Sequence, residues 1–231
     1  MQNVSALYIN IVSGSHWFET KLEIDGVGTF GETELFSINT SHAMFGNSPQ
    51  VGLAVAGEID IKMLYPSVGI PTMACLRPYI RACNDTDQSE WLPQGVYYID
   101  TREQTKDDTG VSFLTIHGYD AMLKAEQFYN GRIVGDSTDV QMVDEIAYQI
   151  GVEVDPRTYD LINSAYTIPF PAGYTYREIL GYIASMYAGC FIMTDEGKLR
   201  LVALYELPAE TNYLIDLVGN AITFGGDRIL V

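Results

Sequence analysis

EWLPQGVYYIDTREQTKDDTGVSFLTIHGYDAMLKA, residues Glu90–Ala125, is the stretch of this 231-residue chain that decides the fold. Two runs rich in β-branched and aromatic residues, Gly95–Thr101 and Val111–Gly118, flank a polar loop, Glu103–Gly110. The side chains of the second run alternate with a period near two, which is typical of a half-buried strand. We therefore expect an antiparallel hairpin, followed by a short helix over Tyr119–Ala125.

The residues before this hairpin read as further strands separated by glycine- and proline-containing turns. Gly57–Leu64 alternates most cleanly, with Ile59, Ile61 and Met63 expected on the buried face. About seven strands over roughly the first 120 residues suit a barrel or a sandwich. The five strands expected ahead of the hairpin are Ala6–Val12, His16–Ile24, Leu35–Thr40, Gly57–Leu64 and Met73–Ala82, the last with Pro78 as a sign of an edge or a bulge.

The second half of the chain has a different pattern. Val140–Ile150 carries an apolar stripe at helical spacing and ends at Gly151, a plausible C-cap. Thr175 begins a second helix, which Gly189 ends, and Glu178 lies at the capping-box distance from Thr175. A hairpin is expected after it, so the range 136–204 predicts two helices on a short sheet. The strands of that hairpin are Cys190–Met193 and Leu199–Ala203, joined by the turn Asp195–Gly197.

The last 25 residues give weaker signals. Leu207–Ala209 reads as a linker, Tyr213–Val218 as irregular, and Ala221–Phe224 as a short strand. Arg228–Val231 begins a strand and stops inside an apolar run. We therefore expect this sequence to be part of a longer protein.

Composition sets outer limits on the class of protein. With 47% hydrophobic and 19% charged residues the chain is expected to be globular. A formal net charge of −17 disfavours binding to nucleic acid, because an acidic surface repels phosphates. Three cysteines without a C-x-x-C spacing predict free, buried thiols. The sequence shows neither a secretory signal peptide nor a run of 18 apolar residues, so no membrane segment is predicted.

No group of residues is typical of an active site. His16, His42 and His117 lack the spacing of a metal site, and His117 is interpreted as a core or capping residue. Asp120 is predicted to cap the short helix, and Asn84–Glu90 to be a solvated loop and not a calcium loop. We therefore predict no catalytic, cofactor-binding or metal-binding residues, no cofactor, and a protein that is not an enzyme.

Three motifs, in order along the chain, carry a resemblance to a known family. They are W-x-P-x-G-x-Y-Y-I-D-T with G-Y-D-A-M-L-K, then R-E-x-L-G-Y-I-A with D-x-G-K-L, and finally A-I-T-F-G-G-D-R. Together they resemble the N-terminal hub region of tail baseplate proteins, the tail-associated lysin or tail endopeptidase type of phages and prophages of Gram-positive bacteria. The matching positions are Trp91, Pro93, Gly95, Tyr97–Thr101, Gly118–Lys124, Arg177, Glu178, Leu180–Ala184, Gly189, Asp195, Gly197–Leu199 and Ala221–Arg228.

The resemblance implies an α+β fold in three parts. A tail-tube-like antiparallel β-barrel is expected over residues 1–129, a small α/β domain over 130–206, and the truncated beginning of a second β-barrel over 207–231. In the family, three copies form a ring that continues the tail tube toward the tip, so the expected partners are two further copies in the full-length protein and other tail and baseplate proteins.

The same resemblance implies that DNA passes through the ring without being bound, and that the protein resides in the virion tail after assembly in the bacterial cytoplasm. Some relatives carry a cell-wall-degrading domain further on. Whether the tail is contractile, which host is infected, whether an enzymatic domain follows Val231, and the oligomeric state of these residues alone stay open.

Two rival functions belong to other classes. A hydrolase or peptidase acting on the cell wall would use carboxylates or histidines such as Asp120 and His117. A carbohydrate-binding receptor module would use the sixteen tyrosines and two tryptophans. The tyrosine excess is also what strand propensity alone produces.

Overall fold

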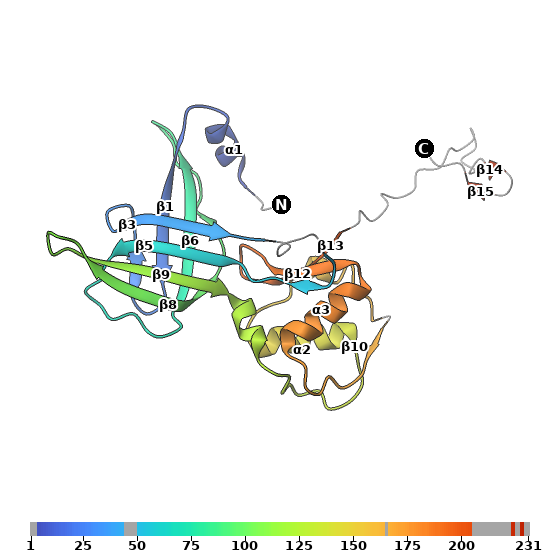
Figure 1. Ribbon diagram of the computed structural model, residues 1–231. Coiled ribbons are helices and arrows are strands. Elements are labelled where there is room, and N and C mark those ends of the chain that lie inside the picture. Colours follow the sequence, from blue (N-terminus) through green and yellow to red (C-terminus); the bar gives the residue numbers. More distant parts are fainter. Residues whose placement is uncertain (1–3, 44–49, 165, 205–222, 225–226, 229–231) are drawn as a thin grey trace.

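The computed structural model describes residues 4–43, 50–164, 166–204, 223–224 and 227–228. Figure 1 shows a β-rich lobe, built mainly from the first 120 residues, beside a mixed lobe that contains the helices α2 and α3. The α+β class is therefore confirmed. The elements are α1 (Ala6–Val12), β1 (Trp17–Ile24), β2 (Gly28–Phe30), β3 (Leu35–Ser41), β4 (Leu53–Ala54), β5 (Glu58–Leu64), β6 (Cys75–Cys83), β7 (Leu92–Pro93), β8 (Tyr97–Lys106), β9 (Ser112–Asp120), η1 (Ala121–Glu126), β10 (Ser137–Thr138), α2 (Asp139–Ile150), η2 (Pro156–Thr158), β11 (Thr167–Ile168), α3 (Tyr176–Met186), β12 (Gly189–Met193), β13 (Leu199–Ala203), β14 (Thr223–Phe224) and β15 (Asp227–Arg228).

The predicted hairpin is the centre of the β-rich lobe. Strands β8 and β9 pair antiparallel, and β8 continues to Lys106, so the connecting turn is only Asp107–Val111 and shorter than the loop predicted. A bulge lies between Ile99 and Thr101. Leu114 is one of the residues that turn inward from β9 to the core.

Around the hairpin the antiparallel sheet runs β2-β1-β6-β8-β9-β5-β3, with β7 added to β6. In β5 the residues Ile59, Ile61 and Met63 are buried while Glu58 and its alternate neighbours are exposed, as the alternation predicts. The path ends at β2 on one side and β3 on the other, and no ladder joins these two strands within the described residues. The sheet is therefore open in this structure, and the expected barrel closure is not seen.

Pro78 lies inside the sheet and not on its edge. Strand β6 pairs with β1 along its length, and on the other side with β8 near Leu76 and with β7 near Tyr79. Pro78 falls between these two partners, where its carbonyl oxygen accepts a hydrogen bond from the Gln94 amide. A missing N–H is tolerated there because no regular ladder occupies that side of the strand.

The first expected strand is a helix. Residues Ala6–Val12 form α1, because the Ser5 hydroxyl accepts a hydrogen bond from the Tyr8 amide and caps the first turn. Ile11 is the buried residue of this helix, whereas Leu7 and Ile9 are exposed. A short apolar run does not distinguish the two structures by its period, so the strand prediction was wrong.

The mixed lobe follows the sequence signals closely. Both helices begin at a capping box, Thr138 with Gln141 in α2 and Thr175 with Glu178 in α3. Gly151 ends α2 in the left-handed conformation, with φ of 77°. Helix α3 ends at Met186, with Tyr187 as its C-cap, before Gly189. The predicted hairpin is formed by β12 and β13.

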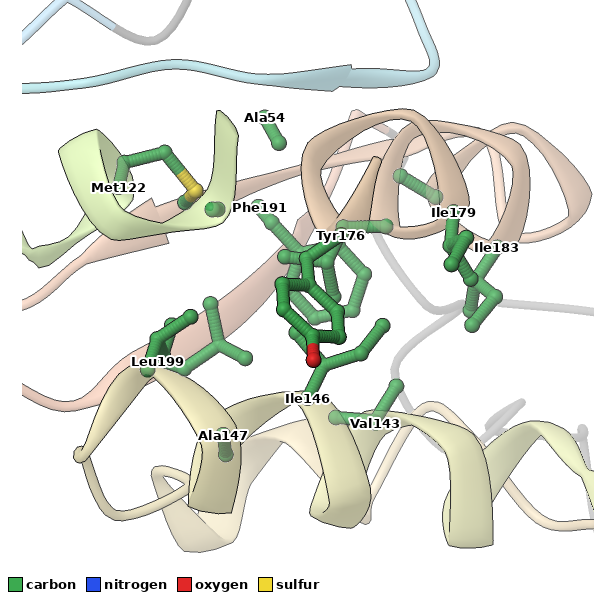
Figure 2. Close-up of a cluster of buried hydrophobic side chains, with 14 of the residues drawn as sticks. Ala54, Met122, Val143, Ile146, Ala147, Tyr176, Ile179, Ile183, Phe191 and Leu199 are labelled. Atoms are coloured by element: carbon green, nitrogen blue, oxygen red, sulfur yellow. The ribbon is translucent and has the colours of Figure 1, made fainter. Parts of the chain in front are cut away.

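The helices enclose a dense apolar core. Figure 2 shows Tyr176 and Phe191 between the facing sides of α2 and α3, with Ile146 and Ile183 packed around them. Helix η1 supplies Met122 to the same cluster. The apolar core of the mixed lobe therefore contains residues from both sides of the expected domain boundary at 129/130.

The two lobes are interlocked by β4. After leaving β3, the chain pairs Leu53 and Ala54 in parallel with β12, so the small sheet has the order β13-β12-β4. To reach β12 it passes directly over α3. An added Cβ on Gly181 would lie 2.8 Å from the carbonyl oxygen of Gly52, so the backbone can pass only where both positions lack side chains.

Cys75, Cys83 and Cys190 are free and buried, as predicted. No helix among the described residues is both long and apolar enough to cross a membrane. Near the C-terminus, β14 and β15 pair as a short antiparallel hairpin. The predicted linker Leu207–Ala209 and the segment Tyr213–Val218 lie outside the described residues.

The contact between Gly52 and Gly181 makes a testable prediction. Gly181→Ala should lower the free energy of unfolding by about 1–3 kcal/mol, because the new methyl group would overlap the Gly52 backbone. In an ordinary helix interior the same change is stabilising by roughly 1 kcal/mol. Urea denaturation measures the difference. Gly135→Ala, whose added methyl group would meet nothing within 4 Å, is the control and should change stability little; equal effects of the two substitutions would contradict this packing.

Candidate functional site

The three histidines make different contacts. His16 contacts the carbonyl oxygen of Gly14 in a turn, at 2.8 Å. His117 is on the outward face of β9, 2.8 Å from the Asp60 carboxylate on the neighbouring strand. Because its side chain is partly exposed and contacts a carboxylate on the neighbouring strand, the interpretation of His117 as a core or capping residue was wrong.

The acidic loop Asn84–Glu90 holds the N-terminal helix in place. The Asn84 side chain accepts hydrogen bonds from the amides of Thr86 and Asp87, which closes the loop on itself. Glu90 accepts from the amide and the hydroxyl of Ser5, at 2.7 and 2.5 Å. Within the residues that the structure describes, no group of three or more His, Cys, Asp or Glu side chains is placed to hold a metal ion.

Asp120 caps η1, as predicted, and also has a second task. One carboxylate oxygen accepts from the Met122 amide at 2.9 Å, and the other accepts from the Gly57 amide at 2.6 Å. The second bond ties the start of β5 to the end of β9. Asp120 is only 2% exposed, and its burial raises the pKa of the carboxyl group to about 6, although both amides oppose that rise.

Next to Asp120 lies a chain of polar side chains at the junction of the lobes. The Tyr97 hydroxyl donates to the carbonyl oxygen of Gln94 and is 2.6 Å from Nε2 of His42. Burial and the nearby Asp120 raise the pKa of Tyr97 well above its ordinary value. His42 in turn is 4.0 Å from the Asp195 carboxylate in the β12–β13 turn. This chain joins β3, β8 and the small sheet.

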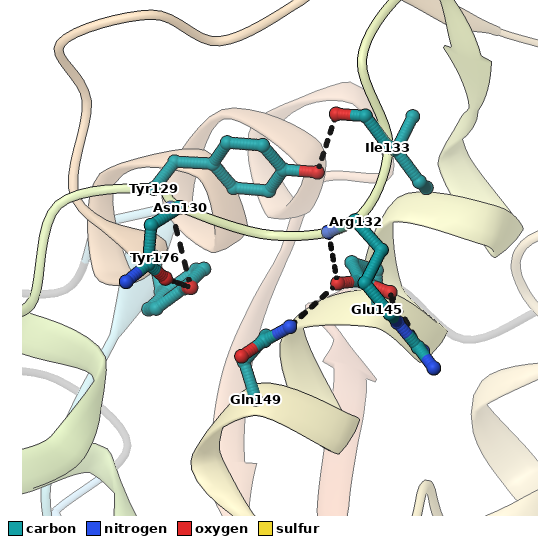
Figure 3. A network of polar contacts seen from close by, with 7 residues as sticks. All are labelled: Tyr129, Asn130, Arg132, Ile133, Glu145, Gln149 and Tyr176. Carbon is teal, nitrogen blue, oxygen red and sulfur yellow. Dashed lines mark hydrogen bonds and ion pairs between the residues drawn. The ribbon is translucent and has the colours of Figure 1, made fainter.

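A second polar network fastens the segment that links the lobes. Figure 3 shows that the Glu145 carboxylate of α2 accepts hydrogen bonds from Arg132 and Gln149. The backbone amide and the guanidinium of Arg132 donate at 2.7–3.0 Å, and the side-chain amide of Gln149 donates at 2.8 Å. Burial opposes ionisation of Glu145, but these hydrogen bonds outweigh it and hold its pKa below the ordinary value. In the same network the Tyr176 hydroxyl donates to the side chain of Asn130. Both carboxylate oxygens of Glu145 therefore accept hydrogen bonds that hold the fold together.

A groove with a mainly apolar lining lies between the lobes. It has a volume of about 790 Å³, and residues 50–56 form one of its walls. Gly181, Tyr182 and Ser185 of α3 and Leu123 of η1 also line it. Sequence analysis missed this groove, although the uncharged run Val51–Ala56 was a visible signal.

Both lobes also present unpaired strand edges. Within the described residues β3 is the end strand of the large sheet, and its one partner is β5. Its seven residues, LFSINTS, include no charge, and Phe36 is 57% exposed at the register shift between Leu35 and Ser37. Natural edge strands are usually protected by charges, proline or a bulge, and the irregularity at Phe36 leaves the uncharged edge 37–41 able to pair with another chain.

Solved structures of known proteins share the fold of this chain. No protein-family model matches the chain, and no curated protein matches it either. Among solved structures, the fold is similar to the 43 kDa tail protein of prophage MuSo2 from Shewanella oneidensis, with a TM-score of 0.54 and 15% identity over 80% of this chain and 53% of that one. A tail protein from Neisseria meningitidis MC58 is also similar, with a TM-score of 0.55 and 13% identity over 88% of this chain and 58% of that one.

The chain thus spans just over half the length of these two structures. At such low identity the likeness shows that the fold is shared.

The buried Asp120 predicts a pH dependence of stability. Its folded-state pKa of about 6 lies above the ordinary 3.8, so the folded protein binds the proton more tightly, and this contribution to stability is lost as pH rises through 6. Relative to Asp120→Asn, the wild type should lose about 1.4 kcal/mol of unfolding free energy between pH 5 and pH 7.5. Urea denaturation of both proteins at the two pH values measures this, and a constant difference would refute the raised pKa.

Proposed function

We propose that this chain is a structural component of a phage or prophage tail baseplate hub, in which three copies form a ring that continues the tail tube toward the tip. The observation that carries the proposal is the fold, which is shared over most of the chain with two tail proteins, one of them from a prophage. The three sequence motifs supply independent support, because they resemble the hub region in the same order along the chain.

The β-rich lobe has the features that a ring protomer needs. A closed ring of identical copies requires two different, complementary faces on each protomer. The large sheet ends in two unlike edges, the three-residue β2 and the seven-residue β3. We propose that β3 pairs with a neighbouring copy, and that closure of the sheet into a barrel-like tube wall is completed by assembly. Residues 1–129, 130–206 and 207–231 are then the tube-wall, outer and second tube-wall parts.

The charge of the chain suits a channel for DNA. Thirteen basic residues against thirty acidic ones give −17, and a wall of that sign repels phosphates and lets a duplex pass without adhering. The protein would then act without turnover and without a cofactor, as part of the virion tail with other tail proteins as partners. Trp91, a candidate for sugar stacking, has Lys21 and Arg81 over its ring, at 5.1 and 4.5 Å, and this cover does not favour a carbohydrate module.

The proposed ring contact is tested by placing a charge on β3. In the natural full-length protein, Phe36→Lys should weaken the trimer at least tenfold, because a lysine at this edge must be desolvated when the strands pair. Light scattering coupled to chromatography measures the mass. The control is Val134→Lys in the outer part, where Val134 is 87% exposed, and it should leave the trimer intact. A wild-type monomer at assembly concentrations, or equal loss in both variants, would refute the proposal.

The charge argument predicts that the chain does not bind DNA. Fluorescence anisotropy of a labelled 20-base-pair duplex at 50 mM salt should show no binding, because a surface with this net charge offers no counterion release. Micromolar affinity that weakens with added salt would contradict the proposed passive channel.

A further inference from the structure

The edge of the small sheet is more apolar than an unpartnered edge usually is. Strand β4 ends the order β13-β12-β4, so one of its sides is unpaired in the described structure. The run that contains it, Val51–Ala56, reads VGLAVA, with no charge and no proline, and Val51 is 45% exposed. The shortness of β4, two residues, is the protective feature of this edge, which carries neither charge nor proline.

This edge does not face open solvent but lines the groove. Residues 50–56 line one side of it, and Tyr182 and Leu123 add apolar surface. Within this segment Leu53 and Ala54 are in strand conformation, and Gly52 has a φ of 79°. An extended peptide can add to this edge over a short register, with the mainly apolar lining of the groove around it.

The charges around the groove select the kind of peptide. Glu58, Glu126 and Glu178 line it together with a single cation, Arg177. That cation is already engaged, because its guanidinium is 3.0 Å from Glu126 and also donates to the carbonyl oxygen of Met122. The groove therefore carries net negative charge and favours Lys or Arg on its occupant.

We propose that this groove binds an extended segment of another protein, which adds as a strand to the free edge of β4, with apolar side chains at alternate positions and Lys or Arg between or beside them. Main-chain hydrogen bonds would supply affinity and the groove walls would supply specificity. The proposal is independent of the trimer, because it uses β4 and the mixed lobe and not the β3 edge.

The chemistry disfavours a second copy of this chain as the occupant. The exposed edge strands β2 and β3 contain no Lys or Arg to complement the charge of the groove. A separate partner with a basic, apolar, extended segment meets this requirement.

A selection experiment tests the proposal with peptides as the probe. A yeast-displayed library of random nine-residue peptides is panned against the full chain, and enriched peptides are synthesised with a fluorophore for anisotropy titrations. We expect a consensus of alternating apolar residues with Lys or Arg. Val51→Lys should weaken these peptides at least tenfold, whereas Val111→Lys should not. Val111 is 41% exposed and belongs to the β8–β9 turn. Figure 1 shows this turn on the side of the β-rich lobe that faces away from the mixed lobe.

A charge exchange separates recognition from a general loss of structure. Glu58→Lys should weaken the basic peptides, and the same peptides with Lys replaced by Glu should recover affinity for that variant. An acidic or charge-free consensus, equal binding to Val51→Lys and wild type, or failure of the exchanged pair would overturn the proposal. A change of oligomeric mass in Val51→Lys would show that the occupant is a second copy, which also overturns it. None of these outcomes bears on Phe36, so failure here is distinguishable from failure of the proposed hub function.

Discussion

The close passage of one backbone over another, at Gly52 and Gly181, is the constraint on which the rest of this structure depends. Between β3 and β5 the chain leaves the large sheet, crosses α3, pairs β4 with β12 and then returns. Neither glycine has room for a side chain. Where the chain returns to the large sheet, the Gly57 amide donates a hydrogen bond of 2.6 Å to the buried Asp120 carboxylate. This single excursion joins the two hydrophobic cores into one molecule and creates the groove beside β4.

The sequence predicted those parts of the fold that local physics determines. Alternation in β5, the capping box at Thr175 and the β8–β9 hairpin are each encoded by residues that lie close together in the sequence. Helix α1 was mistaken for a strand because ALYINIV is apolar almost throughout and its deciding signal is one hydroxyl, that of Ser5. The parallel pairing of β4 with β12 joins residues about 137 apart, and no local period reports such a contact.

The sequence likewise predicted only the local contacts of the candidate site. Asp120 was recognised as a cap, but its bond to Gly57 requires the fold to be known. The groove is assembled from β4, η1 and α3, so its residues stand apart in the sequence. Its one local sign was the uncharged run Val51–Ala56, which pattern analysis passed over because a glycine-containing stretch reads as a loop. The buried ionisable groups Asp120 and Glu145 are each held by backbone and side-chain hydrogen bonds, an arrangement that fixes architecture.

In the proposed tail component, the two lobes present different binding surfaces. The β-rich lobe offers a long uncharged edge for identical neighbours, and the mixed lobe offers an acidic groove for a different partner. A three-dimensional reconstruction of the natural full-length protein by electron cryomicroscopy tests the central claim most directly. The account predicts a ring of three copies in which β3 lies at the contact between protomers and the bore is acidic. A monomer with β3 exposed to solvent, or a ring with a neutral or basic bore, would contradict it.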